Sequence, residues 1–468
     1  MERDQLEAIV SQVLDRIKSG NAPAAKMEAP KRGHGVFKTV ADAVGAATES
    51  QRTLIALPLE RRREIIANIR KRAAEEVRSL ASFAVEETGL GRVEDKIKKN
   101  LLVIYKTPGP EILEPIAYTG DDGLTLIERA PYGVIAAITP STNPTETILC
   151  NGIGMVSGGN TVVFNTHPGA KGVSAFVIDL INKASMEVGG PNNIMTVIES
   201  PTIESANELL RFPGIRLNVV TGGPAVVKAA MNAGKKAICG GPGNPPVVVD
   251  DAADLDQAAR GIIAGCSFDN NVICCDEKET FVVEKVADKL LENLAGHGAV
   301  ILRNHQITRL ERLILTPEKD HTLSKWVGKN ASEYLKQIDV PFKGDPRLIV
   351  CEVGFDHPFV QHELLMPIMP VTRAKDVHEA IDMAVRAEHG FGHTASMYSK
   401  NIDNLHRMAR LSNVSIFVKN ASNFSGLGFQ GEGYTSFTIA SPTGEGLTTA
   451  RNFTRERRCV LAGHFRIV

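Results

Sequence analysis

Two adjacent cysteines, Cys274 and Cys275, follow an asparagine-rich turn in the segment SFDNNVICCDEKE. A cysteine side chain attacks a carbonyl carbon only as the thiolate, so a catalytic cysteine needs surroundings that favour the anion. Adjacent cysteines more often reflect simple packing. The residues alone therefore leave two interpretations open, a nucleophile or a buried pair.

Asn143 stands between Pro140 and Pro144 in the segment ITPSTNPTET, directly after an apolar run typical of a buried strand. A turn held between two prolines can aim an amide N–H₂ group at an oxygen that gains negative charge during a reaction. The same turn could equally well serve only to end the strand.

Two glycine-containing turns complete the candidate segments. In LNVVTGGPAVVKAA, Gly222 and Gly223 separate a strand from a helix, which offers backbone N–H groups and the positive end of the helix dipole to a phosphate. Such turns are common and this one lacks the GxGxxG pattern, so the indication is weak. In ICGGPGNPPVVVD we expect a loop that reverses the chain before a strand.

The elements that must position these residues alternate between short apolar strands and helices. β-Branched runs begin at VIAAIT and continue through TVVFN, IMTVIE, LNVVT and PVVVD, and a second series runs from FVVEKV to SIFVKN. Residues 38–100, which precede both series, have a helical pattern. Apolar strands that alternate with helices indicate parallel sheets, so we predict two doubly wound α/β domains.

The composition is that of an ordinary globular protein. The chain has 468 residues, 43% of them hydrophobic and 23% charged, with a formal net charge of -1 and no basic cluster that would suggest nucleic acid. Its seven cysteines are odd in number and form no CxxC pair, which favours a reducing compartment over a disulfide framework or a zinc site. No secretory signal or membrane-spanning run is apparent, so we expect a soluble protein of the cytoplasm.

Residues 3–18 have apolar side chains along one face of a predicted helix, and residues 19–34 form a linker rich in glycine, alanine, proline and lysine. A short helix on a tether has no core of its own. It either packs back onto the same protein or docks on the surface of another one.

Together and in this order, the segments resemble the aldehyde dehydrogenase superfamily, specifically its CoA-acylating branch associated with bacterial microcompartments. The resemblance runs along essentially the whole chain. It is carried by ETGLGRVEDK, TPGPE, PSTNPTET, HPGAK, VTGGPAVV, GPGNPPVVVD, SFDNNVICCDEK, ELLMPIMPV, SIFVKN, QGEGYTSFTIASPTGEG and RRCVL. It implies that the chain converts acetaldehyde or propionaldehyde to the acyl-CoA, with NAD⁺ as oxidant and coenzyme A as acyl acceptor.

The resemblance also implies a role for each candidate residue. Cys274 matches the nucleophile and Cys275 a non-catalytic position, while Asn143 matches the oxyanion-hole amide, with the backbone N–H of Cys274 as its partner. The implied cofactor contacts are Thr221, Gly222 and Gly223 near the pyrophosphate, His167 and Pro168 on the adenosine side, and Glu363 at the nicotinamide ribose.

One departure from the hydrolytic relatives bears on the reaction. Those enzymes activate water with a glutamate in a Glu-Leu-Gly-Gly motif, whereas Cys239 aligns with that glutamate here, and no Asp or Glu lies between Lys236 and Val249. Losing a positioned general base removes roughly 10²–10⁴-fold from hydrolysis, so we expect the thioester to last until the thiol of coenzyme A arrives. Hydrolysis to the free acid is one alternative, and a catalytically silent cargo or scaffold protein of the microcompartment is another.

The resemblance implies the following organisation. Residues 1–18 form an encapsulation-type helix that binds a shell or cargo protein inside a bacterial microcompartment, and residues 19–34 a flexible linker. Residues 35–240 form the cofactor-binding domain, with an excursion at 113–130 into an oligomerisation element, and residues 241–430 the catalytic domain. Residues 431–468 return to the oligomerisation element, which implies a homodimer or homotetramer. The length of the aldehyde and the preference for NAD or NADP stay open.

Overall fold

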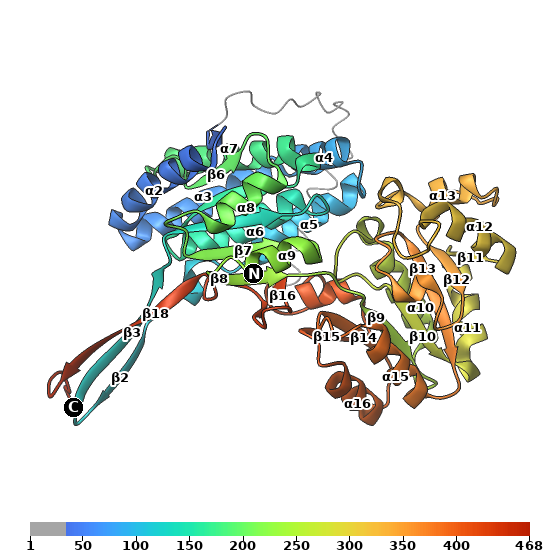
Figure 1. The fold of residues 1–468 in the computed structure, drawn as a ribbon. Coiled ribbons are helices and arrows are strands. Elements are labelled where there is room, and N and C mark those ends of the chain that lie inside the picture. The colour runs from blue at the N-terminus through green and yellow to red at the C-terminus, as the bar shows by residue number, and fades with distance from the viewer. Residues whose placement is uncertain (1–33) are drawn as a thin grey trace. The chain divides into compact units, whose positions relative to one another are not determined.

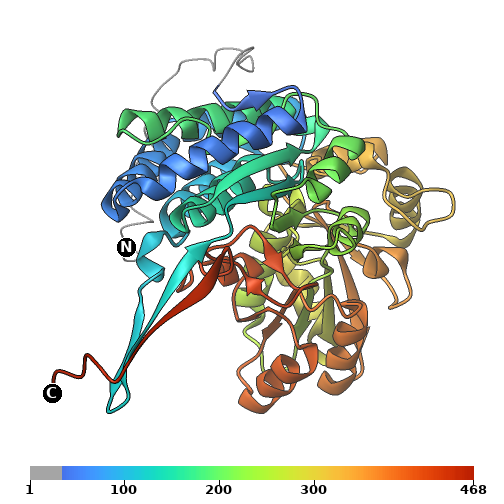
Figure 2. The same cartoon turned by 60° about the vertical axis from the view of Figure 1, so that its left-hand side comes forward.

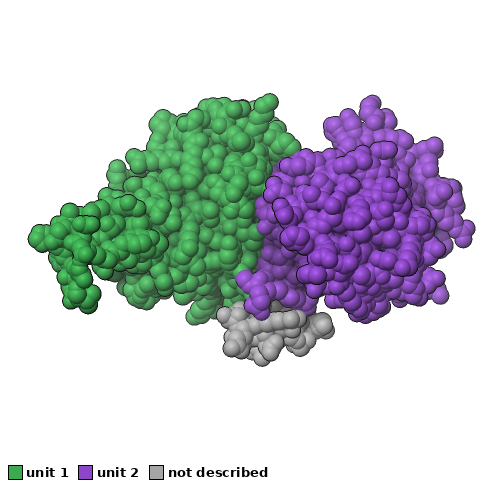
Figure 3. Space-filling model, turned by 90° about the horizontal axis from the view of Figure 1, so that it is seen from below, with its two compact units in different colours: residues 1–87, 97–240, 434–468 green, residues 88–96, 241–433 purple. Residues whose placement is uncertain are grey.

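The computed structural model describes residues 34–468, and these fall into two compact units. Figure 3 colours them separately: unit 1 contains the described residues up to 87, then 97–240 and 434–468, and unit 2 contains 88–96 and 241–433. The predicted helix of residues 3–18 and its linker up to residue 33 lie outside the described residues.

Unit 1 is built on a six-stranded parallel sheet in the order β1-β6-β5-β4-β7-β8 (Figure 1). Its strands are β1 (Val36–Phe37), β4 (Val134–Thr139), β5 (Thr161–Thr166), β6 (Met195–Ile198), β7 (Leu217–Thr221) and β8 (Lys236–Gly240). Its helices are α2 (Val40–Ala56), α3 (Leu59–Glu75), α4 (Val77–Thr88), α5 (Val93–Lys106), α6 (Pro144–Ser157), α7 (Lys171–Glu187), α8 (Ile203–Arg211) and α9 (Pro224–Met231), although α4 and α5 each extend into unit 2.

Every residue of β4 and β5 is buried, which shows that both faces of the sheet are covered. Helices α2 and α8 pack on the face that carries Ala136 and Val163, whereas α3 lies on α6 and α7. The continuous apolar runs seen in the sequence are therefore central strands of a doubly wound sheet.

Unit 2 has a seven-stranded parallel sheet in the order β11-β12-β13-β10-β9-β14-β15. Its strands are β9 (Pro246–Val249), β10 (Glu279–Val283), β11 (Val300–Leu302), β12 (Ile349–Glu352), β13 (Ile368–Ala374), β14 (Thr394–Tyr398) and β15 (Ile416–Lys419). Its helices are α10 (Leu255–Cys266), α11 (Glu284–Gly296), α12 (Asn304–Ile314), α13 (Ala331–Gln337), α14 (Pro358–Gln361), α15 (Val377–Ala387) and α16 (Ile402–Ser412).

Alternate residues of β9 enter different cores of unit 2, as expected for a strand covered on both faces. Val247 and Val249 pack with α10 and α11, while Val248 packs with α15 and α16. The predicted fold class, two doubly wound α/β domains, is therefore confirmed. No helix among residues 34–468 combines the length and apolar character that crossing a membrane requires.

A separate antiparallel sheet belongs to unit 1 and joins distant parts of the sequence. Strands β2 (Ile116–Gly120), β3 (Gly123–Pro131) and β18 (Thr454–Ala462) pair in the order β18-β3-β2, and both views in Figures 1 and 2 show them projecting from the rest of the unit. All of β2 and nearly all of β18 are exposed. A sheet without a core of its own needs another surface to cover it.

Two details differ from the sequence analysis. Residues 88–96, which we expected in the first domain, belong to unit 2, because Gly91 N donates to Gly328 O and Arg92 N donates to Asp269 Oδ1. The segment that we interpreted as a loop before PVVVD begins with a strand, β8, which extends the first sheet alongside β7. A five-residue strand that leads into glycines and prolines has too little pattern to be recognised from sequence.

Candidate active site

Cys274 lies in the loop between α10 and β10, and this loop has an unusual backbone. Asp269, Asn270 and Asn271 have φ angles of 45°, 56° and 66°, so three successive residues with side chains adopt the left-handed conformation. Aspartate and asparagine tolerate this conformation better than most residues, but each such position still stores strain. The surrounding contacts must therefore hold the loop in place.

Those contacts come from buried polar groups of unit 2. Lys96 Nζ lies 2.9 Å from Asp269 Oδ2, Arg92 Nε donates to Asn270 Oδ1 at 3.0 Å, and Asn271 Nδ2 donates to the carbonyl oxygens of Cys266 and Glu277. Gly91 is required beside the loop, because a Cβ at this position would collide with the Asp269 carboxylate.

Lys278 organises the other end of the loop. Lys278 is 3% exposed, and its ammonium group donates to the Asn271 carbonyl at 3.0 Å, to Asn271 Oδ1 at 2.7 Å and to the Ile273 carbonyl at 3.1 Å. A buried cation that bonds two backbone carbonyls fixes the path of the chain directly before Cys274.

The two cysteines differ in exposure. Cys274 is half-buried, whereas Cys275 is 0% exposed. Burial and, to a smaller extent, the Glu363 carboxylate raise the pKa of Cys274 to about 12, although Lys278 opposes both effects. Reagents can therefore reach Cys274 but not Cys275, and Cys274 is a thiol at neutral pH until a bound group favours the anion.

Glu363 lies between α14 and β13, close enough to Cys274 to affect its titration. Its carboxylate is 4.0 Å from Lys278 Nζ, and burial raises its pKa to about 7, against the opposite effects of Lys278 and of the Gly243 N–H. Cys274, Lys278 and Glu363 thus form one electrostatic group in unit 2. Cys274 and Glu363 were predicted from the sequence, whereas Lys278 was not, because it looks like an ordinary surface charge in CCDEKE.

His393 is a second buried residue that was not predicted from the sequence. It is 0% exposed, burial lowers its pKa to about 3, and its Nε2 makes no hydrogen bond with any residue that the structure describes. Gly243 separates it from the loop that contains Cys274, since a Cβ on Gly243 would lie 2.7 Å from the Cys274 carbonyl oxygen and 3.0 Å from the His393 ring. Its position directly before the apolar strand TASMY was the only signal in the sequence.

The remaining predicted residues lie in unit 1, after the carboxyl ends of its parallel strands. Asn143 follows β4, His167 and Pro168 follow β5, and Thr221 ends β7 before Gly222 and Gly223. In this sheet β5 and then β6 lie on one side of β4, whereas β7 and then β8 lie on the other side of β4. The loops after β4 and β7 therefore flank the point at which the strand order reverses, where open α/β sheets bind their ligands.

The turn after β7 can accept a phosphate. Gly223 is the N-cap residue of α9 and no side chain caps the helix, while a Cβ on Gly223 would meet no atom within 4 Å. Thr221 Oγ1 is held by Thr438 Oγ1 at 2.7 Å, and Gly222 N donates to Gly240 O. Uncapped N–H groups beside open space suit the pyrophosphate of a dinucleotide.

His167 begins the short helix η2 (Pro168–Ala170), and its Nδ1 accepts a hydrogen bond from Gly169 N at 3.0 Å. Both His167 and Pro168 are exposed, so their side chains are available to a ligand at this edge of the sheet.

Asn143 is held by a buried lysine of helix α5. Its Oδ1 accepts a hydrogen bond from Lys99 Nζ at 2.6 Å, and the same ammonium lies 3.3 Å from Glu146 Oε1. All three side chains are buried. The lysine was not recognisable from sequence, because EDKIKKN is typical of a solvated helix face.

The interpretation of Cys239 needs one correction. Cys239 is fully buried in β8, and its backbone N–H donates to Thr443 Oγ1, which in turn donates to Glu445. The pKa of Cys239 is raised to about 11 by burial and by the Glu445 carboxylate. A carboxylate is therefore nearby, supplied by the C-terminal segment rather than by the residues between Lys236 and Val249. It is bound to Thr443 and does not replace the side chain at position 239.

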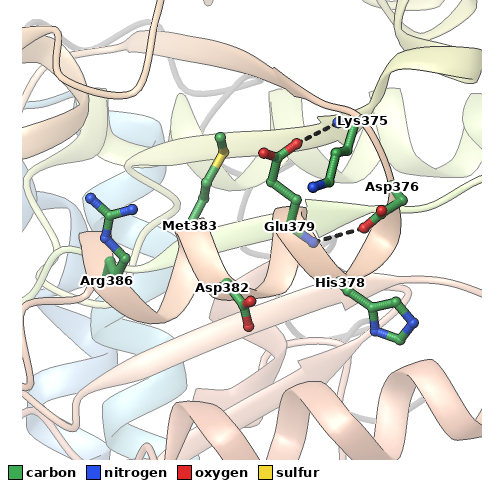
Figure 4. A pocket seen from close by; sticks show the side chains of 7 residues that line it. All are labelled: Lys375, Asp376, His378, Glu379, Asp382, Met383 and Arg386. Atoms are coloured by element: carbon green, nitrogen blue, oxygen red, sulfur yellow. Dashed lines mark hydrogen bonds between the residues drawn. The ribbon is translucent and has the colours of Figure 1, made fainter.

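A hollow on the surface of unit 2, shown in Figure 4, contains none of these residues. It is lined by Lys375, Asp376, His378, Glu379, Asp382, Met383 and Arg386. Asp376 caps α15 by accepting from Glu379 N, and Glu379 accepts from Lys375 N, so two of its carboxylates stabilise the helix start. The hollow carries mixed charge and has no feature of a catalytic site.

Comparisons with known proteins identify the family of the chain. The model of the aldehyde dehydrogenase family matches residues 22–444. The chain is 46% identical to the acetylating acetaldehyde dehydrogenase EutE of Escherichia coli over 100% of both chains. The structure of Rhodopseudomonas palustris propionaldehyde dehydrogenase, with bound CoA and an acylated cysteine, is 46% identical, covers 93% of this chain and 99% of its own, and superimposes with a TM-score of 0.91.

A propionaldehyde dehydrogenase from the fucose utilisation microcompartment of Clostridium phytofermentans is 44% identical, with a TM-score of 0.91 over 93% of this chain and 100% of its own. With a half-buried cysteine on a fixed loop, an asparagine after the central strand and full-length similarity of this degree, the chain belongs to the aldehyde dehydrogenase family.

Proposed function

We propose that this chain is a CoA-acylating aldehyde dehydrogenase that oxidises a short aldehyde, acetaldehyde or propionaldehyde, and forms the acyl-CoA. The single observation that carries the proposal is the full-length similarity, at 46% identity, to an acetylating acetaldehyde dehydrogenase. The half-buried Cys274, on a loop organised by a buried lysine, supplies the nucleophile that such a reaction needs.

In the proposed mechanism, the Cys274 thiolate attacks the carbonyl carbon of the aldehyde and forms a C–S bond. The Asn143 N–H₂ group and the backbone N–H of Cys274 bind the resulting oxyanion. When bound, NAD⁺ accepts the hydride that leaves this carbon, and coenzyme A supplies the thiol that takes the acyl group from Cys274.

In unit 1, residues after β5 and at the end of β7 would hold the adenosine side and the pyrophosphate of the cofactor. We propose that Gly222 and Gly223 bind the pyrophosphate, with Thr221 beside it, because the N-terminus of α9 has no side-chain cap and open space in front of it. His167 and Pro168 would contact the adenosine side and Glu363 the nicotinamide ribose. Cys274, whose pKa is raised by burial and by the Glu363 carboxylate, would need the positive charge that NAD⁺ supplies when bound to favour its thiolate.

The residue at position 239 favours transfer of the acyl group to a thiol rather than to water. A buried cysteine whose pKa is about 11 stays protonated at neutral pH and cannot activate water as a carboxylate would. The test is to supply aldehyde and NAD⁺ with and without coenzyme A and to follow NADH and the acyl product. We expect repeated turnover to acyl-CoA only when coenzyme A is present, and sustained release of free acid without it would refute the proposal.

The exposed antiparallel sheet supports a homodimer or homotetramer. Ile116 is 48% exposed, Tyr118 60% and Val460 58%, an apolar set that projects into solvent in a single chain. A second copy of the same sheet is the partner with matching strands and apolar side chains. Light scattering after size exclusion should give a dimer or tetramer, and Tyr118→Asp with Val460→Asp should give a monomer. A wild-type monomer at micromolar concentration would contradict this.

For residues 3–18 we propose docking to a shell or cargo protein of a bacterial microcompartment, in the cytoplasm. The apolar face of the predicted helix supports this, as does the microcompartment origin of one similar structure. A chain that starts at His34 should keep its activity and stability but no longer co-purify with shells, and the segment should carry an unrelated reporter into them. Entry of the truncated enzyme would refute this role.

A further inference from the structure

Asn143 is the N-cap residue of α6, yet its side chain does not cap that helix. An asparagine at this position ordinarily accepts a hydrogen bond from the second or third N–H of the helix through Oδ1. Here Oδ1 accepts from Lys99 Nζ at 2.6 Å, and Nδ2 donates to Thr142 Oγ1 at 3.2 Å. The amide is therefore held by groups outside the helix that it begins.

The chemistry of the partner determines which end of the amide faces it. The two ends of an asparagine amide have nearly the same shape, but an ammonium group only donates hydrogen bonds. The end facing Lys99 must therefore be the carbonyl. The Glu146 carboxylate, which is also fully buried, lies 3.3 Å from the same Nζ and so holds the ammonium group from a second side.

We infer that Lys99 is a positioning residue that holds the Asn143 carbonyl and thereby leaves the N–H₂ end available to the oxygen of the reacting aldehyde. Lys99 acts through Asn143 and does not touch the substrate, so the inference rests on the oxyanion role proposed for Asn143. Without the lysine, the amide can turn its acceptor end toward the developing negative charge, which repels rather than stabilises it.

The competing explanation is that Lys99 and Glu146 are a buried ion pair that only stabilises the fold. The two explanations predict different energetic coupling between substitutions at Lys99 and at Asn143. A purely structural lysine lowers activity independently of Asn143, whereas a positioning lysine has nothing left to position once the Asn143 amide has been removed.

The experiment is a double-mutant cycle on the full chain with Lys99→Met and Asn143→Ala, read as the rate of the first-turnover burst of NADH. Asn143→Ala should slow the burst by roughly 10²–10³-fold, the usual loss for one oxyanion donor. Lys99→Met should slow it by no more than that, with little change in KM for the aldehyde, and should cause no further loss in the Asn143→Ala background.

Two companion variants keep the test decisive. Lys99→Met alone leaves the Glu146 carboxylate buried beside an apolar side chain, so Lys99→Met with Glu146→Gln removes both charges and should show the same slow burst. Lys96→Met is the matched control, because Lys96 lies on the same helix and is equally buried but pairs with Asp269. The fold loss in burst rate caused by Lys96→Met should multiply with the fold loss caused by Asn143→Ala.

A second measurement distinguishes the loss of Asn143 positioning from general disruption around Cys274. Alkylation of Cys274 by iodoacetamide creates no oxyanion, so its rate should be the same in Lys99→Met as in the wild type. The inference would be overturned if the losses from Lys99→Met and Asn143→Ala multiplied in the double variant. It would also be overturned if Lys99→Met slowed alkylation and the burst to the same extent, or if Lys99→Met with Glu146→Gln kept a wild-type burst. If Asn143→Ala itself keeps the wild-type burst, the proposed oxyanion role fails instead, and the inference with it.

Discussion

Replacing Lys278 with methionine should make Cys274 less reactive. The ammonium group lowers the pKa of Cys274 and also holds the preceding backbone through three hydrogen bonds of 2.7–3.1 Å. Methionine has a similar length but no charge and no donor. The substitution therefore removes a nearby positive charge that favours the Cys274 thiolate, and leaves two backbone carbonyls without their buried donor.

The magnitude has two parts. Removing one member of a buried charged group destabilises a protein by about 3–5 kcal/mol, which is a large share of the roughly 5–15 kcal/mol that holds a domain together. Each unit by which the Cys274 pKa rises lowers the thiolate fraction about tenfold at any pH below that pKa. We expect at least one such unit, because a fully buried cation is lost and the Glu363 carboxylate stays.

The assay is the pH dependence of alkylation by iodoacetamide, without cofactor, in a Cys459→Ser background. Cys459 is the only exposed cysteine, so this background leaves Cys274 as the one accessible thiol. Near pH 8, Lys278→Met should react about tenfold more slowly or worse. Lys289→Met, which removes an exposed lysine paired with Glu292, should match the wild type.

Glu363→Gln tests the same reasoning with the opposite sign. The carboxylate raises the pKa of Cys274, so removing its charge should shift the alkylation profile to lower pH and speed the reaction. If both variants shifted the profile in the same direction, a general loosening of the loop would explain the data and the electrostatic account would be refuted.

Three further outcomes are expected. Cys274→Ala should abolish NADH formation while Cys275→Ala keeps most of it, since the second thiol is fully buried; the reverse result would mean that the nucleophile has been misassigned. Without coenzyme A, oxidation should stop near one NADH per active site, and Glu445→Gln should leave that stoichiometry unchanged; loss of slow residual turnover in this variant would instead identify Glu445 as a base for water. Burial lowers the pKa of His393 to about 3, below its ordinary value of 6.5, so the neutral ring contributes stability above pH 6.5 that is lost as pH falls toward 3. His393→Asn should accordingly flatten the decline of the urea midpoint between about pH 7 and pH 5, and an equally steep decline would show that the ring does not titrate in this way.

The fold could be predicted because its strands are continuous apolar runs. Each strand that is buried on both faces, such as β4 and β9, is a run of apolar residues in the sequence, and helices separate these runs. Strand β8 escaped prediction, since it begins with the exposed Lys236 and ends in glycine, and only its pairing with β7 makes it a strand.

The site was only partly predictable, for a different reason. The proposed nucleophile and the proposed oxyanion-hole asparagine lie in segments with distinctive neighbours. Lys99, Lys278 and His393 owe their surroundings to contacts with residues far away in the sequence. Lys99 meets Asn143 44 residues away, and burial turns an ordinary helix lysine into a fixed donor. Glu445 shows the converse error, because a carboxylate absent from the local sequence reaches Cys239 from the C-terminal segment.

The discontinuous composition of unit 1 has a consequence for the order in which a newly made chain can fold. Asn160 Nδ2 bonds the carbonyl of Phe453, 293 residues later, and β3 pairs with β18 along its full length. Nearly all of unit 2, residues 241–433, is synthesised in between. At roughly 5–20 residues per second the ribosome needs about 10–40 s for that stretch.

During this interval the first unit to emerge lacks its last strand, while the second can already complete its sheet. One edge of β3 stays open beside the short β2, and an unpaired edge is where a neighbouring nascent chain can add a strand. Unit 1, whose synthesis begins first, is therefore the last to finish folding. Its open strand edge is exposed to aggregation while unit 2 is still being translated.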